Sequence, residues 1–515
     1  MKKTLLLLLP FLIWLSNFFY DDLFFVKDRN MILYAIIKVI YILLLYLSEY
    51  GLLWIIKGIK EKKPEARICL ISFVGIFLFY IIWLIFAYPG GWGWDGYTIL
   101  EYTKNYDINY WTGLLTSIEY FLALMIFPSP VSVVILQIYL AALIIARICL
   151  IFYKLMGKEN LVFFVLIPFV LPISISYVLC PIRAILFALL SLEVCMEFIS
   201  INRGGVSLLQ LCVFSGLLSL SAFWRSEGCM FILLIPCVVI NIWNKISKRV
   251  VLEFLSISVI MLVVMKSVTI SNYQYMITSL YYPIQHMVQS NEVDYEGVSE
   301  DLEKIDRVFN VEVMKQSYSD PKGGFSQEGF AYGKEGFHPE NATVEDYHEM
   351  LEGFCRMVLH KPLLFAKVRI QTFLGSMQQG DFGVASIRNF DKEVGSSFGL
   401  ENYLFFERWN VDVQRKIVGF LSYKFGKVSI DILRRTINNM LYPIIVICGA
   451  FVYCVIKRKW DIAMVTFCYI GITCGTIVFE PLGQPMYYLH QYIFGYVLLV
   501  WGILDVYKLK RRHRI

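Results

Sequence analysis

The 515 residues of this chain are too apolar for a protein surrounded by water: 58% are hydrophobic, 17% are charged, and the mean hydropathy is +0.61. A soluble fold of this length could not bury so much apolar surface, so the composition excludes a soluble enzyme or binding protein and predicts that the solvent is lipid. The net charge of +6 does not indicate a nucleic-acid partner, because the Lys and Arg residues lie in short loops and in the tail, as a membrane topology requires.

Twelve apolar runs are candidate transmembrane helices, since a helix needs about 20 residues to cross the hydrocarbon core. The first of them resembles a signal peptide in position, but no small-residue cleavage site follows it, so we expect it to be retained. The sequence therefore predicts an all-α polytopic membrane protein of about twelve helices. Their approximate limits are 4–20, 31–55, 68–87, 129–152, 161–179, 184–201, 206–223, 228–244, 250–270, 438–456, 461–479 and 486–506.

Lys and Arg residues indicate the direction of these spans. Every loop that twelve spans would place on one side is basic, and cytoplasmic loops are enriched in Lys and Arg. We therefore expect a multi-pass protein of the cell membrane with both termini in the cytoplasm and with the other loops outside. The basic sites are Lys2 and Lys3, 57–67, 154–158, Arg203, 245–249, 457–459 and 508–514.

The chain divides into three predicted parts. Residues 1–270 form an N-terminal membrane module of about nine spans, with a long first outer loop at 88–128. Residues 271–437 form an extracytoplasmic, mostly helical insertion between the ninth and tenth spans, and they contain 18 Lys and Arg and 23 Asp and Glu. Residues 438–515 supply three further spans and a basic tail.

Two regions outside the spans have a predicted helical character. Residues 344–376 are predicted to be helical, with Thr343 as the cap, and the mixed basic and apolar stretch 359–369 suits a helix on a membrane surface. Residues 111–127 are mildly apolar, but counting them as a span would invert the basic-loop pattern. We expect an interfacial or re-entrant helix there, beside the loop of Asp95.

Four short polar motifs lie in gaps between spans on the predicted outer side. Charge near the hydrocarbon boundary is costly and tends to mark a functional site. The motifs are Tyr88-Pro89-Gly90-Gly91-Trp92-Gly93-Trp94-Asp95-Gly96-Tyr97, Cys180-Pro181-Ile182-Arg183, Trp224-Arg225-Ser226-Glu227-Gly228, and Glu480-Pro481-Leu482-Gly483-Gln484-Pro485.

The first motif supplies the candidate catalytic residue. Asp95 lies among glycines, which let the backbone turn tightly and approach a ligand, and its carboxylate could accept a proton from an attacking hydroxyl. An ordinary loop aspartate is the alternative. Glu101 is a weaker candidate on the same loop, as are Asp107 and Glu119. Aromatic side chains beside Asp95 could stack on sugars or belong to the interfacial aromatic belt: Trp92, Trp94 and Tyr97.

The second and third motifs supply candidate phosphate ligands. Arg183 and Arg225 each stand at the outer end of a span, and a guanidinium offers a rigid fork of donors that matches a phosphate. The alternatives are contact with lipid headgroups and, for Arg225, pairing with Glu227.

The fourth motif leads into the last span. His490 could donate to a phosphate or a leaving oxygen, or it could be a satisfied buried histidine. Gln484 and Tyr488 are candidate contacts for an acceptor or a sugar. Toward the inner side, Glu193 and Glu197 share one helix face, where they either pair with Arg147 or form a proton relay.

This order of motifs resembles the membrane glycosyltransferases of the GT-C superfold, in which a long first outer loop carries an essential acid just after an early span. The start Tyr88-Pro89-Gly90…Trp94-Asp95 is similar to the "PG…WD" start of the bacterial DUF6020-type branch. Arg183 with Phe187, and Arg225-Ser226-Glu227-Gly228, stand where that branch shows an arginine opening a span and an "R-x-x-G" turn. The similarity covers about 85–230, with a weaker echo in 358–374 and 480–491.

The resemblance implies an outward-facing transferase. Its donor would be a sugar on a polyprenyl phosphate, and its acceptor an envelope glycan, lipid or polymer. Asp95 would be the base, Arg183 and Arg225 would hold the phosphate, and His490 would assist. The chain departs from the pattern because it has no His-Pro pair after the Asp95 loop. No Asp-x-Asp pair or zinc pattern is present, so no motif supports a divalent metal or any other cofactor.

Two alternatives remain open. A Wzy-like polymerase of lipid-linked oligosaccharides also uses outer arginines and about twelve spans. A twelve-span transporter commonly has two matched halves with helices broken near the midplane, and a break around Pro168 or Pro172 would favour that class.

Overall fold

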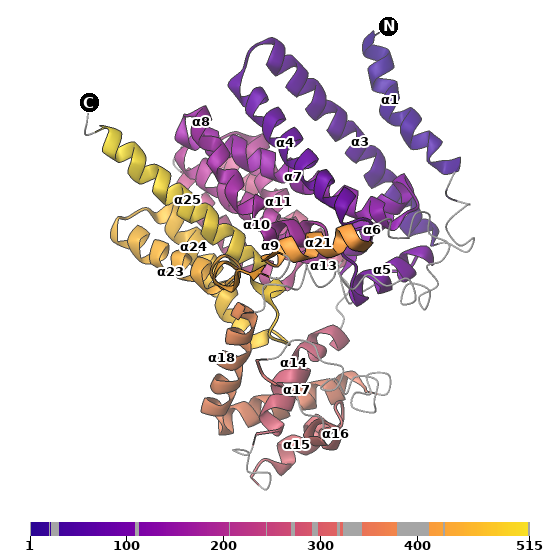
Figure 1. The fold of residues 1–515 in the computed structure, drawn as a ribbon, viewed down its shortest axis with the longest axis vertical. Helices are drawn as coiled ribbons and strands as arrows, with labels where there is room; N and C mark the ends of the chain where they lie inside the picture. Colours follow the sequence, from indigo (N-terminus) through magenta and orange to yellow (C-terminus); the bar gives the residue numbers. More distant parts are fainter. Residues whose placement is uncertain are drawn as a thin grey trace.

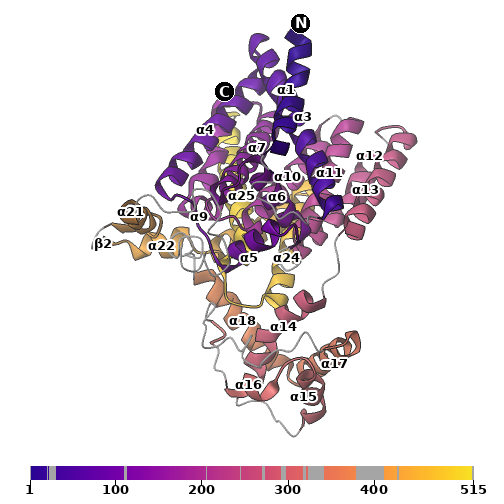
Figure 2. The ribbon, with the colours of Figure 1, turned by 90° about the vertical axis from the view of Figure 1, so that its right-hand side faces the viewer.

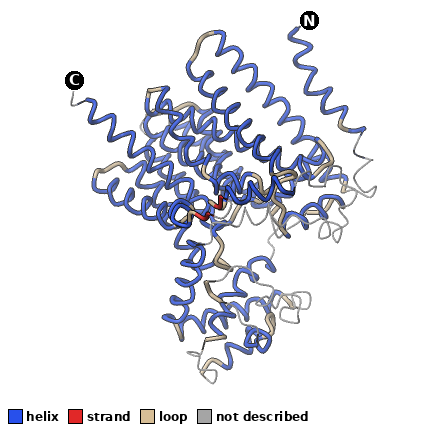
Figure 3. Tube along the Cα trace, in the orientation of Figure 1, coloured by secondary structure: helices blue, strands red, loops and turns tan. Residues whose placement is uncertain are grey.

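The computed structural model describes residues 2–19, 21, 30–108, 113–204, 206–243, 245–268, 273–290, 297–316, 320–322, 342–378, 411–425 and 428–512. These residues are almost entirely helical (Figure 1 and Figure 3). The exception is an antiparallel pair of two-residue strands, β1 Lys424–Phe425 and β2 Val428–Ser429, in which Lys424 pairs with Ser429. The predicted all-α class is confirmed for this part of the chain.

One large bundle contains most of the helices. Its N-terminal part consists of α1 Lys2–Ser16, α3 Met31–Lys60, α4 Pro64–Phe86, α5 Trp94–Lys104, α6 Leu114–Ile126, α7 Pro130–Met156, α8 Glu159–Val162, the 3-10 helix η1 Phe163–Val170, α9 Pro172–Val178, α10 Arg183–Arg203, α11 Leu208–Trp224, the 3-10 helix η2 Ser226–Leu233, α12 Leu234–Ile242 and α13 Lys248–Val268. Its C-terminal part consists of α21 Val411–Leu421, α22 Asp431–Ile437, α23 Leu441–Ile456, α24 Trp460–Phe479, the 3-10 helix η4 Pro485–Tyr488 and α25 Leu489–Arg512.

The predicted membrane character is confirmed by helix length and composition. Every predicted span coincides with a helix or with a succession of short helices. In the described part of the chain, seven helices are long and apolar enough to cross a membrane: Met31–Lys60, Pro64–Phe86, Pro130–Met156, Arg183–Arg203, Arg435–Ile456, Trp460–Phe479 and Pro485–Asp505. Leu114–Ile126, Leu208–Trp224 and Ser226–Ile242 are shorter apolar helices. The total of twelve spans stays a prediction.

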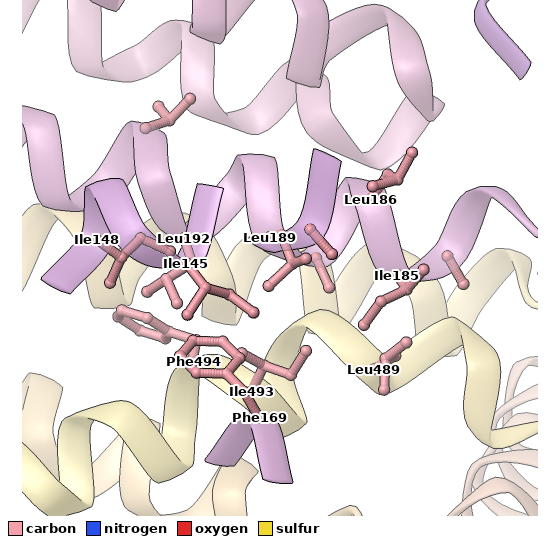
Figure 4. Packing of buried hydrophobic residues seen from close by; sticks show 14 of the residues in the cluster. Ile145, Ile148, Phe169, Ile185, Leu186, Leu189, Leu192, Leu489, Ile493 and Phe494 are labelled. Atoms are coloured by element: carbon pink, nitrogen blue, oxygen red, sulfur yellow. The ribbon is translucent and has the colours of Figure 1, made fainter. Parts of the chain in front are cut away.

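Helix α10 lies at the centre of the bundle. Its apolar residues cover its whole circumference, as expected of a helix surrounded by other helices, and 94% of its most apolar window is buried. Figure 4 shows Ile185 of α10 next to Leu489 of α25, and Leu189 of α10 on the side of Ile493 and Phe494 of α25. Because α10 starts at Arg183, this arginine lies near the middle of one end of the bundle.

The predicted span 161–179 is broken. Pro168 lies inside η1, and α9 starts at Pro172 after a residue of extended conformation, because proline lacks the amide hydrogen that a continuous helix requires. The carbonyls near the break have partners inside the protein. Ser174 Oγ donates to the Pro168 carbonyl at 2.7 Å, and Tyr80 Oη donates to the Phe169 carbonyl at 2.7 Å.

The two ends of the bundle differ. The basic loops lie together, since ion pairs join Arg67 to Glu159 and join Arg203 to Asp461 at 2.5 Å. Figure 1 shows the chain termini toward this end and α14 to α18 beyond the other end. The four polar motifs lie at the ends of the helices away from the basic loops.

The described part of 271–437 divides between two cores. A separate helical domain consists of α14 Tyr273–Val288, α15 Ser299–Asp306, α16 Val311–Gln316, α17 Val344–His360 and the start of α18 Pro362–Gln378. Helix α21 instead packs into the bundle, where Leu421 is fully buried. Helix α21 of the predicted insertion therefore belongs to the bundle and not to the separate helical domain.

The predictions for the helices outside the spans are confirmed. Thr343 caps α17 as expected, because its hydroxyl and the Asp346 carboxylate form a reciprocal capping box. The helical character predicted over 344–376 is confirmed, and it is divided between two helices, because Pro362 starts α18. This break also divides the stretch 359–369. The short helix expected near 111–127 is present as α6, whose 13 residues are too few to cross a bilayer.

Tight packing of α25 on α23 provides a test of this arrangement. A methyl group added at Gly495 would lie 2.6 Å from Pro443 of α23, whereas one added at Gly502, also in α25, would meet nothing within 4 Å. We expect Gly495→Ala to lower the free energy of unfolding by about 1–3 kcal/mol through overpacking. Thermal unfolding of the purified protein in detergent measures this loss. Equal midpoints for G495A and G502A would contradict the packing of these two helices.

Candidate functional site

The first motif packs against the second through its glycines. Gly90 has a φ of +106°, and a side chain there would lie 2.8 Å from the Leu179 carbonyl and from Val134. The amide of Gly91 donates to the same Leu179 carbonyl at 2.8 Å. Glycine is therefore required at Gly90 by both conformation and space. The contact holds the start of α5, and with it Asp95, beside the chain that leads into α10.

Two buried side chains fix the turn that precedes Arg183. Gln137 of α7 donates from Nε2 to the carbonyls of Val178 and Cys180 at 2.8 and 2.9 Å. Tyr120 of α6 donates from its hydroxyl to the Pro181 carbonyl at 2.6 Å. These bonds give partners to backbone carbonyls that have none within the helix where α9 ends. Because both donors belong to buried residues of the bundle, they fix the turn that leads to Arg183.

Asp95 and Arg183 form the accessible part of the site. Asp95 lies in the first turn of α5 and is exposed to solvent, and Arg183 is half-buried. Burial among surrounding protein atoms raises the pKa of Asp95, while the Arg183 guanidinium nearby lowers it. A carboxylate that is both reachable and partly desolvated has the environment of a functional acid or base. Arg183 also stands at a helix N-terminus, where a cation is unfavourable unless an anion is close.

The third motif forms a buried ion pair. Arg225 Nη2 lies 2.6 Å from Glu227 Oε1, and Arg225 Nε donates to Glu227 Oε2 at 3.3 Å. The guanidinium carbon lies 5.6 Å from the ring centroids of Phe187 and Tyr487. The turn needs Gly228, since a side chain there would lie 2.1 Å from the Ser221 carbonyl. The alternative considered for Arg225, pairing with Glu227, is the arrangement found.

His490 lies behind this ion pair. Its side chain is 1% exposed, and its ring centroid lies 5.1 Å from that of Phe187 and 6.0 Å from that of Tyr469. Neither ring nitrogen has a hydrogen-bond partner among the described residues. Arg225 and Glu227 are close enough to act on it electrostatically. A buried imidazole with two open positions can bind a polar group or an ordered water.

The four motifs therefore meet at one end of the bundle. Asp95 acts electrostatically on Arg183, and Arg183 acts on Glu227. Glu227 is paired with Arg225, which in turn lies near His490. Glu227 entered the sequence reasoning only as a possible partner of Arg225. Glu227 interacts with both arginines and so connects Arg183 to Arg225. The spacing of these residues in the sequence does not reveal this connection.

The predicted aromatic and polar contacts differ in exposure. Trp92, Tyr97 and Tyr488 are buried, so their rings pack on protein and are not placed to stack on a sugar. Trp92 donates to the Pro89 carbonyl at 3.2 Å. Trp94, in contrast, is 68% exposed beside Asp95. The remaining two candidates are the half-buried Glu101 and the buried Gln484.

The fourth motif also joins the bundle to α18, an arrangement that the sequence did not indicate. Arg369 of α18 is 2% exposed and donates from Nε to the Ile477 carbonyl at 2.9 Å and from Nη2 to the Glu480 carbonyl. Ser376 of α18 donates to Glu480 Oε2 at 3.1 Å. Burial raises the pKa of Glu480 to about 8, although Arg369 and Ser376 favour its charged form. This joint connects the helical domain to the site.

Charges elsewhere in the bundle have a structural explanation. Arg147 pairs with Glu193, and its Nη2 lies 2.5 Å from Glu197 Oε1, as the first alternative expected. Gln210 adds a bond to Glu197 at 3.1 Å. Among the described residues, no group of three or more His, Cys, Asp and Glu side chains is placed to hold a metal ion.

The buried pair of the third motif gives a stability prediction. Glu227→Gln leaves the Arg225 guanidinium buried beside a neutral partner, and we expect a loss of about 3 kcal/mol in the free energy of unfolding. The control is Glu253→Gln in the pair Arg249–Glu253, whose side chains are 36% exposed or more. An exposed pair contributes about 0.5 kcal/mol. Thermal unfolding in detergent compares them, and an equal loss in both variants would contradict the buried pair.

Glu480 gives a pH prediction. Its pKa is raised above the ordinary 4.5 to about 8, so between these values the folded state binds more protons than the unfolded state. Stability should therefore fall as the pH rises through this window, by roughly 2–4 kcal/mol from this group. Glu480→Gln should flatten the fall, whereas a change at the exposed Glu303 should not. Melting temperatures at about pH 5 and pH 9 test this. An equal change of melting temperature with pH in wild type and E480Q would contradict the raised pKa of Glu480.

Comparison of the chain with models of protein families, with curated proteins and with solved structures finds no match. The resemblance to GT-C glycosyltransferases therefore depends on the motifs themselves. What the site does has to follow from its chemistry: an accessible carboxylate, a half-buried arginine, a buried ion pair and an open histidine, at one end of an apolar bundle.

Proposed function

We propose that this protein is a membrane glycosyltransferase of GT-C type. It transfers a sugar from a polyprenyl-phosphate-linked donor to an envelope glycan, lipid or polymer. The observation that carries the proposal is that Asp95, which solvent reaches, interacts electrostatically with Arg183 at the end of the bundle away from the basic loops. A base and a phosphate ligand in one site are the minimum that this reaction needs.

The chemistry assigns a role to each group. The acceptor oxygen attacks the anomeric carbon of the sugar, and its proton passes to the Asp95 carboxylate. The bond between that carbon and the phosphate oxygen breaks, and the electron pair leaves with the polyprenyl phosphate. Arg183 and the N-terminus of α10 stabilise the charge that develops on the phosphate. Partial desolvation makes Asp95 a stronger base than an aspartate in water.

Arg225 and His490 have supporting roles in this proposal. Because Arg225 is already paired with Glu227, it holds the wall of the site and leaves Arg183 as the principal phosphate ligand. His490 has open ring nitrogens and can donate to a phosphate oxygen through a water. Trp94 is the exposed aromatic residue beside Asp95 that can stack on a sugar.

A lipid-borne donor explains where the site lies. The reacting phosphate of such a donor stays at the membrane surface while its tail remains among lipid chains, so a site at the ends of the helices meets it directly. The basic loops at the other end support a topology of about twelve spans with both termini in the cytoplasm and the site on the extracytoplasmic face, by the positive-inside rule. No cofactor is required by this scheme.

Transport is the second candidate, because the break at Pro168 and Pro172 is the feature that would favour it. Broken helices of transporters leave backbone groups open to coordinate an ion. Here the Pro168 and Phe169 carbonyls accept hydrogen bonds from Ser174 and Tyr80. Since the carbonyls at this break already have partners, the break supports transport less than the cluster at the bundle end supports transfer.

Asp95→Asn tests the proposed base. In membranes of cells that make the protein, we expect the variant to lower the release of polyprenyl phosphate from its sugar-linked form by 10²–10⁴-fold, the usual contribution of a general base. Mass spectrometry of extracted lipids measures donor and product. The control is Asp107→Asn, an exposed aspartate that follows α5.

Three outcomes of this assay separate the hypotheses. Loss in D95N with normal turnover in D107N supports the transferase. Full turnover in D95N contradicts the role of Asp95 as the base. A product that grows by a whole oligosaccharide repeat identifies a Wzy-like polymerase instead of a transferase of single sugars.

A further inference from the structure

The charges of the large polar insertion are segregated along the chain. Residues 271–410 contain 21 Asp and Glu against 12 Lys and Arg, whereas residues 411–437 contain two Asp against six Lys and Arg. The basic residues are thus concentrated in the piece that directly precedes the span Arg435–Ile456. This piece is therefore basic, whereas the acidic residues of the insertion lie mostly in 271–410, before it in the chain.

The basic piece lies against the bundle beside the candidate site. Figure 2 shows α21 and α22 next to the ends of α4 and α9, apart from α15 to α17. The Phe420 ring of α21 lies 5.6 Å from that of Trp83 in α4, and Gln414 donates to the Tyr88 carbonyl at the start of the first motif. Helix α21 therefore crosses the end of α4, where the chain leaves the predicted span.

Apolar side chains are exposed on the same piece. Ile432 is 80% exposed, and Ile430, Leu433 and Phe420 are exposed as well. They alternate with the exposed cations Lys424 and Arg435. Such a mixture of apolar and basic side chains is typical of segments that lie at a bilayer surface.

Exposed apolar side chains also lie on helix α4, against which α21 packs. Ile82 and Ile85 of α4, near Trp83, are exposed on a helix that is long and apolar enough to cross a membrane. The side chains of Ile430, Ile432 and Leu433 precede another such helix. Apolar groups between two lipid-facing helices are covered most simply by the same bilayer.

We propose that residues 411–425 and 428–437 form an interfacial anchor that binds the anionic headgroups of the bilayer on the side of the candidate site. The apolar side chains insert at the boundary of the acyl chains, and Lys416, Lys424 and Arg435 contact lipid phosphates. Each cation near an anionic surface raises the affinity roughly fivefold. The anchor fixes the end of α4 at the membrane surface, and it does so whether or not the protein is a transferase.

Hydrogen–deuterium exchange of the full-length protein in lipid nanodiscs tests the anchor. In discs that contain phosphatidylglycerol as well as phosphatidylcholine, we expect the amides of 430–437 to exchange several-fold more slowly than in discs of phosphatidylcholine alone. The double variant Lys424→Gln/Arg435→Gln should abolish this difference. Ile432→Asn keeps the charge but removes the apolar contact, and it should speed exchange in both kinds of disc.

A charge-matched control and a soluble anion complete the test. Arg307→Gln/Arg356→Gln removes two exposed cations of the helical domain and should leave the lipid dependence unchanged. Equal exchange in both discs for the wild-type protein would overturn the proposal. Slowing by inorganic phosphate in phosphatidylcholine discs, equal to that by phosphatidylglycerol, would also overturn it, because the piece would then be an anion site and not a lipid surface.

Discussion

Lipid offers no hydrogen bonds, and this constraint organises the whole molecule. A polar group inside the bundle has to find a partner in the protein or lie at a helix end. The Lys38 ammonium lies 2.7 Å from the Asp21 carboxylate, and both side chains are buried. Arg147 is paired with two glutamates. These charges are neutralised within the bundle, whereas Asp95, which is exposed, and Arg183 lie at its end.

The same constraint explains how the site is connected to the rest of the protein. Tyr487 and Tyr488 are neighbours in η4, but they contact different parts of the molecule. The Tyr487 ring lies 5.6 Å from the Arg225 guanidinium, and the Tyr488 ring lies 5.5 Å from Phe373 of α18. Through Glu480 and Arg369, the helical domain is bonded to the same turn. A displacement of α18 would therefore be transmitted through η4 to the Arg225 side chain.

Much of the fold follows from residue patterns that act locally. Apolar runs predicted the helices, Thr343 predicted the start of α17, and the positions of Glu193 and Glu197 predicted their pairing with Arg147. Prediction failed where a helix breaks and side chains supply the missing hydrogen bonds. The predicted span 161–179 is broken near Pro168, and the break persists because Tyr80 and Ser174 donate hydrogen bonds to the free carbonyls. Those partners cannot be identified from the broken segment itself.

The site was harder to predict because it depends on distances between segments that are far apart in the sequence. Motif chemistry selected Asp95, Arg183, Arg225 and His490, but their approach depends on Gln137 and on glycines that allow close packing. Exposure was the least predictable property. Trp92 and Trp94 stand two positions apart in one motif, yet the first is buried against Pro89 and the second is open to solvent, since the start of α5 turns between them.

The most direct test of the central claim is native mass spectrometry of the protein with added polyprenyl phosphate. The account predicts that the wild-type protein retains this lipid and that Arg183→Gln loses it, whereas Arg307→Gln, which removes a cation from the helical domain, binds it normally. Retention of the lipid by R183Q at the wild-type level would contradict the claim that the end of the bundle around Asp95 and Arg183 is a site for a phosphate-linked lipid.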